Sequence, residues 1–187
     1  CRFRPPIFRT CATNCSVPGM YNYENALAAV AVGKYFGVSD AEIKTALSAF
    51  SGVSGRSENS RIALKNGACV TLVKDCYNAN AESTASVLSF CASAKDVNRR
   101  IYVLGDMLEL GENTLADHTN IMKIVEEQGF DKVILVGKIF AKTQSEYTAF
   151  DNVDGLIEYL TSAPISGSAI LLKGSNSIGL ERLIEYL

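Results

Sequence analysis

Four short stretches of this sequence concentrate the side chains that could bind a ligand or take part in catalysis. They combine amides, carboxylates and one guanidinium, which together supply hydrogen-bond donors, acceptors and both signs of charge. The stretches are Asn22 with Asn25, Arg56 with Glu58, residues 75–80 (DCYNAN) and residues 106–112 (DMLELGE). They form a site only if the fold brings them together.

Each stretch also has a purely structural interpretation. Either asparagine of the first pair could cap the helix that follows it. Arg56 alone could be a solvated surface charge. Asp75 and Asn78 could form a turn by bonding their own backbone. The single histidine, His118, could be a structural residue with a solvent-facing edge. No stretch decides the function by itself.

Three apolar runs end in loops that contain glycine or a charge. The runs are 101–104, 133–136 and 169–172, followed by Gly-Asp, Gly and Lys-Gly-Ser respectively. Apolar runs this short indicate strands buried on both faces of a parallel sheet. Because ligands of open α/β sheets bind at the carboxyl ends of the strands, we expect Asp75, Gly105 and Lys173 at one edge.

Strands and helices alternate along most of the chain, which predicts an α/β fold with a mostly parallel sheet and helices on both faces. Residues 51–60 have linker composition and predict a division into residues 1–52 and 53–187. A capping box, Ser39 with Glu42, opens the second of two helices before the linker. The expected helices are 25–36, 39–50, 82–94, 115–128, 138–146, 153–160 and 177–187, with a hairpin of 61–65 and 68–75 around Asn66-Gly67 and a weak strand at 148–150.

Composition narrows the class of protein. The 187 residues are 48% hydrophobic and 20% charged, with a net charge of -2 and no basic block, so a nucleic-acid partner is not expected. No apolar stretch approaches the roughly 20 residues that cross a bilayer, which favours a cytoplasmic protein without a membrane partner. Cys11 and Cys15 lack a second pair, so no metal site is expected there. The cysteines at 69, 76 and 91 are expected to be reduced and buried.

Five motifs, taken in order, resemble the Mur ligases of peptidoglycan synthesis. Within that family they are most similar to the branch that adds D-alanyl-D-alanine to UDP-MurNAc-tripeptide. Together they run from about residue 18 to the C-terminus, and their number and order make the resemblance specific. The motifs are GMYNYENALAA (19–29), GRSE (55–58), DCYNAN (75–80), LGDMLELG (104–111) with His118, and LKGS (172–175).

The resemblance implies a three-domain enzyme that uses ATP and Mg²⁺. This chain contains no G-x-x-x-x-G-K-[ST] phosphate loop and none of the family's magnesium ligands, which are expected upstream. We therefore expect the chain to hold the last helices of a central ATPase domain and a whole Rossmann-like C-terminal domain. Alone it should be inactive, and the parent enzyme should be monomeric.

The resemblance also implies roles for individual residues. Asn22 and Asn25 would face adenine, and Arg56 would reach the ATP phosphates and stabilise charge in the transition state. Asp75 would accept hydrogen bonds from the ribose hydroxyls, with Tyr77 and Asn78 lining the same crevice.

The substrate side is implied less directly. Asn80, Asp106, Lys173 and Ser175 would lie near the acceptor substrate, where Lys173 or the helix start after Ser175 could attract a carboxylate. Asn176 replaces an arginine common in the family at that point, which weakens this assignment. The alternatives are another Mur-type or folylpolyglutamate-type amide ligase and a non-catalytic α/β nucleotide-binding module.

Overall fold

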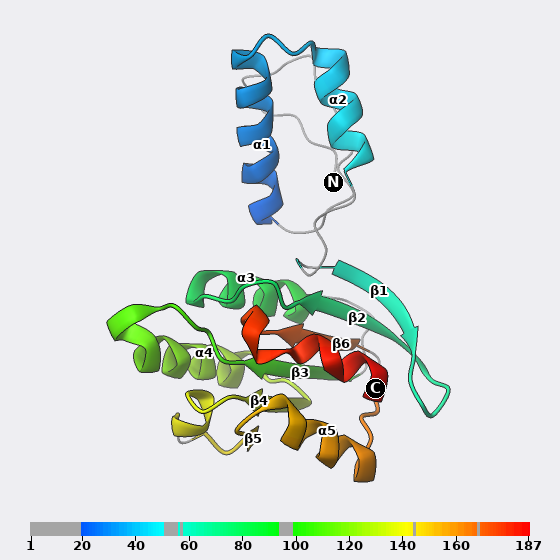
Figure 1. The fold of residues 1–187 in the computed structure, drawn as a ribbon, viewed down its shortest axis with the longest axis vertical. Helices are drawn as coiled ribbons and strands as arrows, with labels where there is room; N and C mark the ends of the chain where they lie inside the picture. Colours follow the sequence, from blue (N-terminus) through cyan, green and yellow to red (C-terminus); the bar gives the residue numbers. More distant parts are fainter. Residues whose placement is uncertain (1–19, 51–55, 57, 94–98, 144, 168) are drawn as a thin grey trace. The chain divides into compact units, whose positions relative to one another are not determined.

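The computed structural model describes residues 20–50, 56, 58–93, 99–143, 145–167 and 169–187 (Figure 1). The chain divides into two compact units, Cys1–Val53 and Ser54–Leu187. The division falls within the stretch of linker composition, and each unit is described by itself below.

The first unit contains two helices, α1 (Met20–Tyr35) and α2 (Asp40–Ala49). The capping box expected from the sequence is confirmed, since the Ser39 hydroxyl accepts from the Glu42 N–H and the Glu42 carboxylate accepts from the Ser39 N–H. Val30 and Ile43 are buried. The capping interpretation of Asn22 and Asn25 is wrong, because both lie inside α1 rather than before it.

The second unit is built on a six-stranded sheet in the order β1-β2-β6-β3-β4-β5. Only the β1–β2 pair is antiparallel, so the expected α/β class with a mostly parallel sheet is confirmed. The strands are β1 (Glu58–Ala63), β2 (Cys69–Asp75), β3 (Arg100–Gly105), β4 (Lys132–Val136), β5 (Thr148–Phe150) and β6 (Ala169–Lys173).

Helices cover both faces of this sheet, because alternate strand residues enter two separate cores. On β3, Ile101 and Val103 pack in a core with residues of α5 (Val153–Ser162) and of the C-terminal segment. Tyr102 and Leu104 pack in the other core with residues of α3 (Ala81–Ala92) and α4 (Thr114–Gln128). Burying one such side chain contributes about 1.5–3 kcal/mol, so these two cores dominate the stability of the unit.

Two expected helices are wrong. The described residues of 138–146 form only a 3-10 turn, η2 (Phe140–Lys142), and 177–187 forms 3-10 segments, η3 (Asn176–Ile178) and η4 (Leu180–Tyr186). Gly179 separates η3 from η4 with a φ of 75°, a left-handed conformation that interrupts a helix. One further 3-10 turn, η1 (Gly111–Asn113), precedes α4.

The hairpin also differs from the expected two-residue turn. Ala63 pairs with Cys69, and the Leu64 N–H donates to the Ala68 carbonyl at 2.8 Å, which leaves residues 65–67 as the connection. Gly67 has a φ of 80°. A three-residue loop that ends in a left-handed glycine is the next most common hairpin connection after the two-residue types.

The cysteines in the second unit differ in exposure. Cys76 is buried, Cys91 is half-buried, and all three cysteines of this unit are free thiols. The prediction that Cys69 is buried is wrong, because Cys69, the first residue of β2, is exposed. Cys11 and Cys15 lie outside the described residues. Across the part of the chain that the structure describes, no helix is long and apolar enough to span a membrane.

Candidate functional site

The carboxyl ends of β2, β6 and β3 lie side by side in the sheet. Asp75 pairs in register with Lys173, and Leu104 pairs with Lys173 from the other side. Gly105 follows directly, so the expectation that Asp75, Gly105 and Lys173 share one edge is confirmed. The backbones approach closely here, because a Cβ on Gly174 would lie 3.0 Å from the Gly105 Cα.

Lys173 is enclosed at this edge. Its Nζ lies 3.2 Å from Asp75 Oδ2 and donates to the Asn78 carbonyl oxygen at 2.5 Å. The residue is 1% exposed. Burial lowers the pKa of the Lys173 ammonium, while the charge of Asp75 acts in the opposite direction. The sequence placed Lys173 here correctly, but it did not show that the ammonium already has internal partners.

Arg56 and Tyr77 form a second contact beside this edge. The guanidinium carbon of Arg56 lies 4.4 Å from the centroid of the Tyr77 ring, within the range of a cation–π interaction. Both side chains remain exposed, Tyr77 at 51%. The stacking keeps the guanidinium next to the DCYNAN loop while leaving it accessible to a ligand.

The two asparagines of the same loop bond to nearby backbone. The Asn78 side chain accepts from the Ala79 N–H at 2.8 Å. Asn80 caps α3, since its side chain accepts from the Ser83 N–H at 2.8 Å and the Ser83 hydroxyl accepts in return from the Asn80 N–H. This capping role accounts for the Asn80 side chain, which we had expected near the acceptor substrate.

The carboxylate of Asp106 is used inside the protein. Its Oδ2 accepts from the Ile139 N–H and its Oδ1 from the Phe140 N–H, both at 2.9 Å. Gly137 provides the space, because a Cβ there would lie 2.2 Å from the Asp106 Cγ. Asp106 is 3% exposed, so the structure favours a positioning role over the expected contact with substrate. The sequence marked Gly137 as a strand end but gave no sign of this partnership.

Three consecutive backbone amides after β3 bond to three different elements. The N–H of residue 106 donates to the Val136 carbonyl at 2.9 Å, that of residue 107 to the His118 Nε2 at 3.0 Å, and that of residue 108 to the Ser175 Oγ at 2.9 Å. The Ser175 N–H also donates to the carbonyl of residue 106 at 3.1 Å. Ser175 is buried and ties two loops together, which differs from the expected role in substrate binding.

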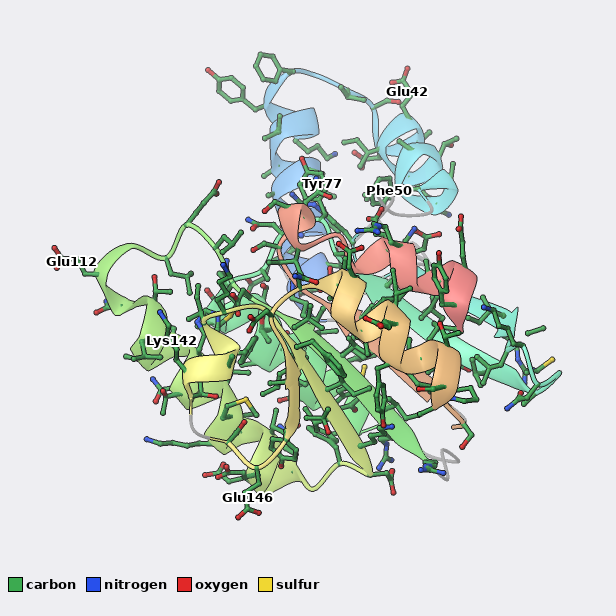
Figure 2. All side chains as sticks on the ribbon, turned by 60° about the horizontal axis from the view of Figure 1, so that its bottom comes forward. Glu42, Phe50, Tyr77, Glu112, Lys142 and Glu146 are labelled. Carbon is green, nitrogen blue, oxygen red and sulfur yellow. The ribbon has the colours of Figure 1, made fainter. Side chains whose placement is uncertain are left out.

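His118 is fully buried, so the expected solvent-facing edge is wrong. A backbone N–H can only donate, which makes Nε2 the acceptor of the Met107 bond and places the proton on Nδ1. Nδ1 then donates to the Thr114 carbonyl at 2.6 Å. The ring is therefore neutral, and its Nε2 lies 3.7 Å from Asp106 Oδ1 without forming an ion pair. Glu112, beyond this loop, points away from the sheet (Figure 2).

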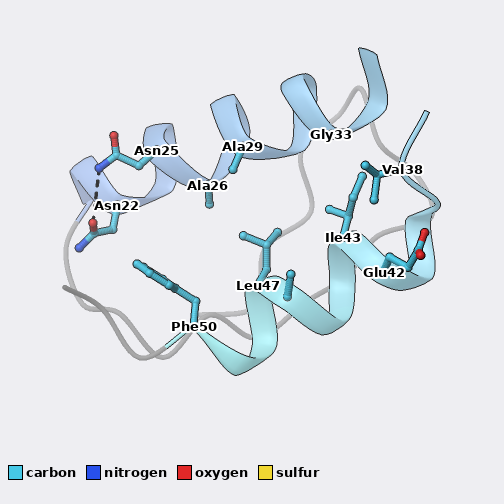
Figure 3. A pocket seen from close by; sticks show the side chains of 11 residues that line it. Asn22, Asn25, Ala26, Ala29, Gly33, Val38, Glu42, Ile43, Leu47 and Phe50 are labelled. Carbon is cyan, nitrogen blue, oxygen red and sulfur yellow. Dashed lines mark hydrogen bonds between the residues drawn. The ribbon is translucent and has the colours of Figure 1, made fainter. Parts of the chain in front are cut away.

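The asparagines of the first unit lie at one end of a cavity between α1 and α2. The cavity has a volume of about 550 Å³ and a mostly apolar lining that includes Ala26, Ile43 and Leu47 (Figure 3). The Asn25 amide donates to the Asn22 side-chain oxygen at 3.5 Å. Two amides thus meet an apolar space large enough for a small molecule.

Comparison with known proteins places this geometry in a family. Residues 55–176 match the family described as "Mur ligase, glutamate ligase domain". The chain belongs to the Mur ligase family. The match includes Arg56, the DCYNAN loop and the end of β6, so the edge described above lies within the shared domain.

Individual relatives give the same result. The UDP-N-acetylmuramoyl-tripeptide--D-alanyl-D-alanine ligase of Treponema pallidum is 31% identical over 180 residues, covering 91% of this chain and 38% of that protein. A crystal structure of MurF from Acinetobacter baumannii is 26% identical with a TM-score of 0.72, covering 94% of this chain and 39% of that one. The MurF ligase of Thermotoga maritima in complex with ADP shares the fold, with a TM-score of 0.71 at 21% identity, covering 90% of this chain and 38% of that one. The chain therefore spans about two fifths of the length of these relatives.

Proposed function

We propose that this chain is the C-terminal part of an ATP-dependent ligase that adds D-alanyl-D-alanine to UDP-MurNAc-tripeptide. In such a reaction the tripeptide carboxylate attacks the γ-phosphate of ATP, and the dipeptide amine then displaces phosphate from the acyl phosphate. The enzyme must hold three charged partners in line and neutralise phosphate charge. The second unit would complete the nucleotide site and then separate from it, as closing domains do in many enzymes.

The observation that carries the proposal is the group of residues at the carboxyl edge of β2 and β6. Asp75 ends β2 with a carboxylate of the kind that accepts hydrogen bonds from hydroxyl groups, and Arg56 rests on the ring of Tyr77, two residues further along the chain. A guanidinium that is stacked yet exposed can meet phosphate oxygens in a two-pronged geometry. We assign Arg56 the stabilisation of charge in the transition state.

In the helical unit, we assign Asn22 and Asn25 to the adenine ring. An amide both donates and accepts, which suits the edge of a purine, and the apolar cavity beside the pair suits its faces. We further assign this unit to the end of the central ATP-binding domain.

Among residues 20–50, 56, 58–93, 99–143, 145–167 and 169–187, no three side chains of His, Cys, Asp or Glu gather as a metal site would require. No step is therefore assigned to Mg²⁺ through this chain. We expect its ligands in the part of the relatives that lies outside the match.

Steady-state phosphate release by the complete ligase tests the role of Arg56. With saturating dipeptide, Arg56→Ala should lower kcat about a hundredfold, because losing one such electrostatic donor costs about 3 kcal/mol, while the KM for ATP changes less. Arg56→Lys should recover only part of the rate. Arg61→Ala is the matched control, since Arg61 is an exposed arginine on β1. An Arg56→Ala variant within about twofold of wild type would remove Arg56 from the mechanism.

Nucleotide binding by this chain alone distinguishes the ligase from a stand-alone module. The chain has no phosphate loop motif, so only base, ribose and Arg56 contacts are available to ATP. Calorimetric titration should give a Kd of about 1 mM or weaker. Micromolar binding would instead support an independent nucleotide-binding module.

A further inference from the structure

Lys173 has the surroundings of an internal anchor rather than those of a binding group. Its ammonium is enclosed between the Asp75 carboxylate and the Asn78 carbonyl, and 1% of the residue reaches solvent. Both partners belong to the end of β2 and the loop after it, whereas Lys173 ends the neighbouring strand β6. One side chain thus connects two segments that are 95 residues apart in the sequence.

The charges favour this arrangement over the capture of an anion. A buried ammonium is costly unless it is paired and hydrogen-bonded, and Asp75 with the Asn78 carbonyl supplies both requirements. An ammonium has three donors, of which two are used here. Because Asp75 already neutralises Lys173, a substrate carboxylate would gain little from binding there.

The contact also determines how the DCYNAN loop presents its side chains. The contact with Asp75 Oδ2 restricts the rotation of that carboxylate, and the bond to the Asn78 carbonyl restrains the loop three residues further on. Tyr77 lies between these two attachment points and carries the Arg56 guanidinium on its ring. A displacement of the loop would therefore move both groups that we assign to the nucleotide.

We propose that Lys173 is a positioning residue for ATP: it orients the Asp75 carboxylate toward the ribose and does not bind the acceptor substrate. This inference rests on the proposed function, because it takes the ribose of ATP as the ligand of Asp75. The proposal can therefore be tested by removing the ribose hydroxyls from ATP and measuring the KM for the nucleotide.

The test compares ATP with 2′,3′-dideoxy-ATP in the complete ligase. In the wild type, removing both hydroxyls should raise the KM for nucleotide about tenfold or more, since hydrogen bonds to a charged group are lost. In Lys173→Met, the KM for ATP should rise toward the value for the dideoxy analogue, and the ratio of the two should fall below about threefold. The KM for D-alanyl-D-alanine should stay within about twofold of wild type. Lys138→Met, at an exposed lysine just after β4, is the matched control and should change neither value.

A double-mutant cycle keeps the proposal testable if Lys173→Met fails to fold. Asp75→Asn removes the charge that Lys173 balances, so the pair Asp75→Asn with Lys173→Met should fold. If Lys173 acts through Asp75, the KM for ATP of the double variant should lie within about threefold of that of Asp75→Asn alone. A further tenfold loss would mean that Lys173 acts independently and would overturn the proposal.

Two other outcomes would also overturn it. One is a Lys173→Met enzyme that keeps the wild-type preference for ATP over the dideoxy analogue. The other is a Lys173→Met enzyme whose KM for the dipeptide rises while that for ATP does not, as an anion-binding lysine would require. Failure of the proposed function looks different, because the wild-type ligase would then release no phosphate when given ATP and both substrates.

Discussion

Replacing Gly137 by alanine should unfold the second unit at a markedly lower temperature. Gly137 has a φ of 128°, in a region that L side chains rarely adopt, and its added Cβ would lie 2.2 Å from the Asp106 Cγ. The Asp106 carboxylate cannot retreat without losing the N–H groups of Ile139 and Phe140, which it accepts at 2.9 Å. Backbone strain and lost hydrogen bonds therefore add together.

The magnitude follows from these two contributions. A non-glycine residue in a sparsely populated backbone region costs about 1–3 kcal/mol. A hydrogen bond to a charged group contributes about 1.5–3 kcal/mol, and up to two of them are disturbed. We expect Gly137→Ala to lower the unfolding free energy by about 4 kcal/mol, which for a domain of this size corresponds to a fall in Tm of roughly 10 °C or more.

Thermal unfolding followed by circular dichroism measures this loss. Gly129→Ala is the control, because Gly129 also has a positive φ, 62°, but a Cβ there would meet nothing within 4 Å. That variant should lose only about 1–2 kcal/mol from the left-handed backbone. If both variants lose the same amount, the contact with Asp106 does not matter and the reasoning is refuted. On an Asp106→Ala background, the additional cost of Gly137→Ala should shrink to that of its backbone strain alone, about 1–3 kcal/mol.

Three further outcomes are expected. Burial raises the pKa of the Cys76 thiol from 9.0 to about 12, so the unfolded chain loses this proton at a lower pH than the folded chain does. The unfolding free energy should therefore fall between pH 9 and pH 12. Urea titrations should show a smaller fall for Cys76→Ala than for the control Cys69→Ala. His118→Leu should cost about 1–3 kcal/mol in the same assay at pH 7, because the Met107 N–H loses its acceptor, and an unchanged midpoint would contradict the assigned bond. Asn80→Ala should cost about 1 kcal/mol through loss of the α3 cap, and Asn80→Ser, which can also cap, should restore most of it.

The sequence predicted the sheet well because its signals are local. The runs at 101–104, 133–136 and 169–172 are apolar on every residue, as strands covered on both faces require. Parallel pairing then places all carboxyl ends at one edge, so the proximity of Asp75 to Lys173 could be predicted without knowledge of the register.

The errors arise where a distant side chain determines local structure. Residues 138–146 have helical composition, but the N–H groups of Ile139 and Phe140 donate to Asp106, which follows β3 and lies more than 30 residues away in the sequence. The residues of this segment alone do not reveal that its N–H groups bond to Asp106 instead of to helix carbonyls. The burial of His118 cannot be predicted from its own segment for the same reason, since it depends on Met107 and on packing against Phe140 with ring centroids 4.5 Å apart.

The site residues show the same limit in a different form. Their position along the chain predicted which edge they occupy, but not which of their atoms are already engaged. Lys173 and Ser175 are at the expected place, yet both make internal bonds that only the folded structure reveals. Residue type and spacing thus predicted where in the fold these residues lie better than they predicted what their side chains do.

The amides of residues 106–108 have a consequence for dynamics. This segment has no regular secondary structure, yet its three N–H groups are held by β4, α4 and the loop after β6. The rate of amide hydrogen exchange depends on how readily the hydrogen bond of each N–H opens, whatever type of secondary structure contains it. These amides can exchange only when separate parts of the unit come apart, so they should be protected as strongly as those of the central strands. We therefore expect residues 106–108 to move with the sheet, so that a motion that admits or releases a ligand would involve other segments of the site.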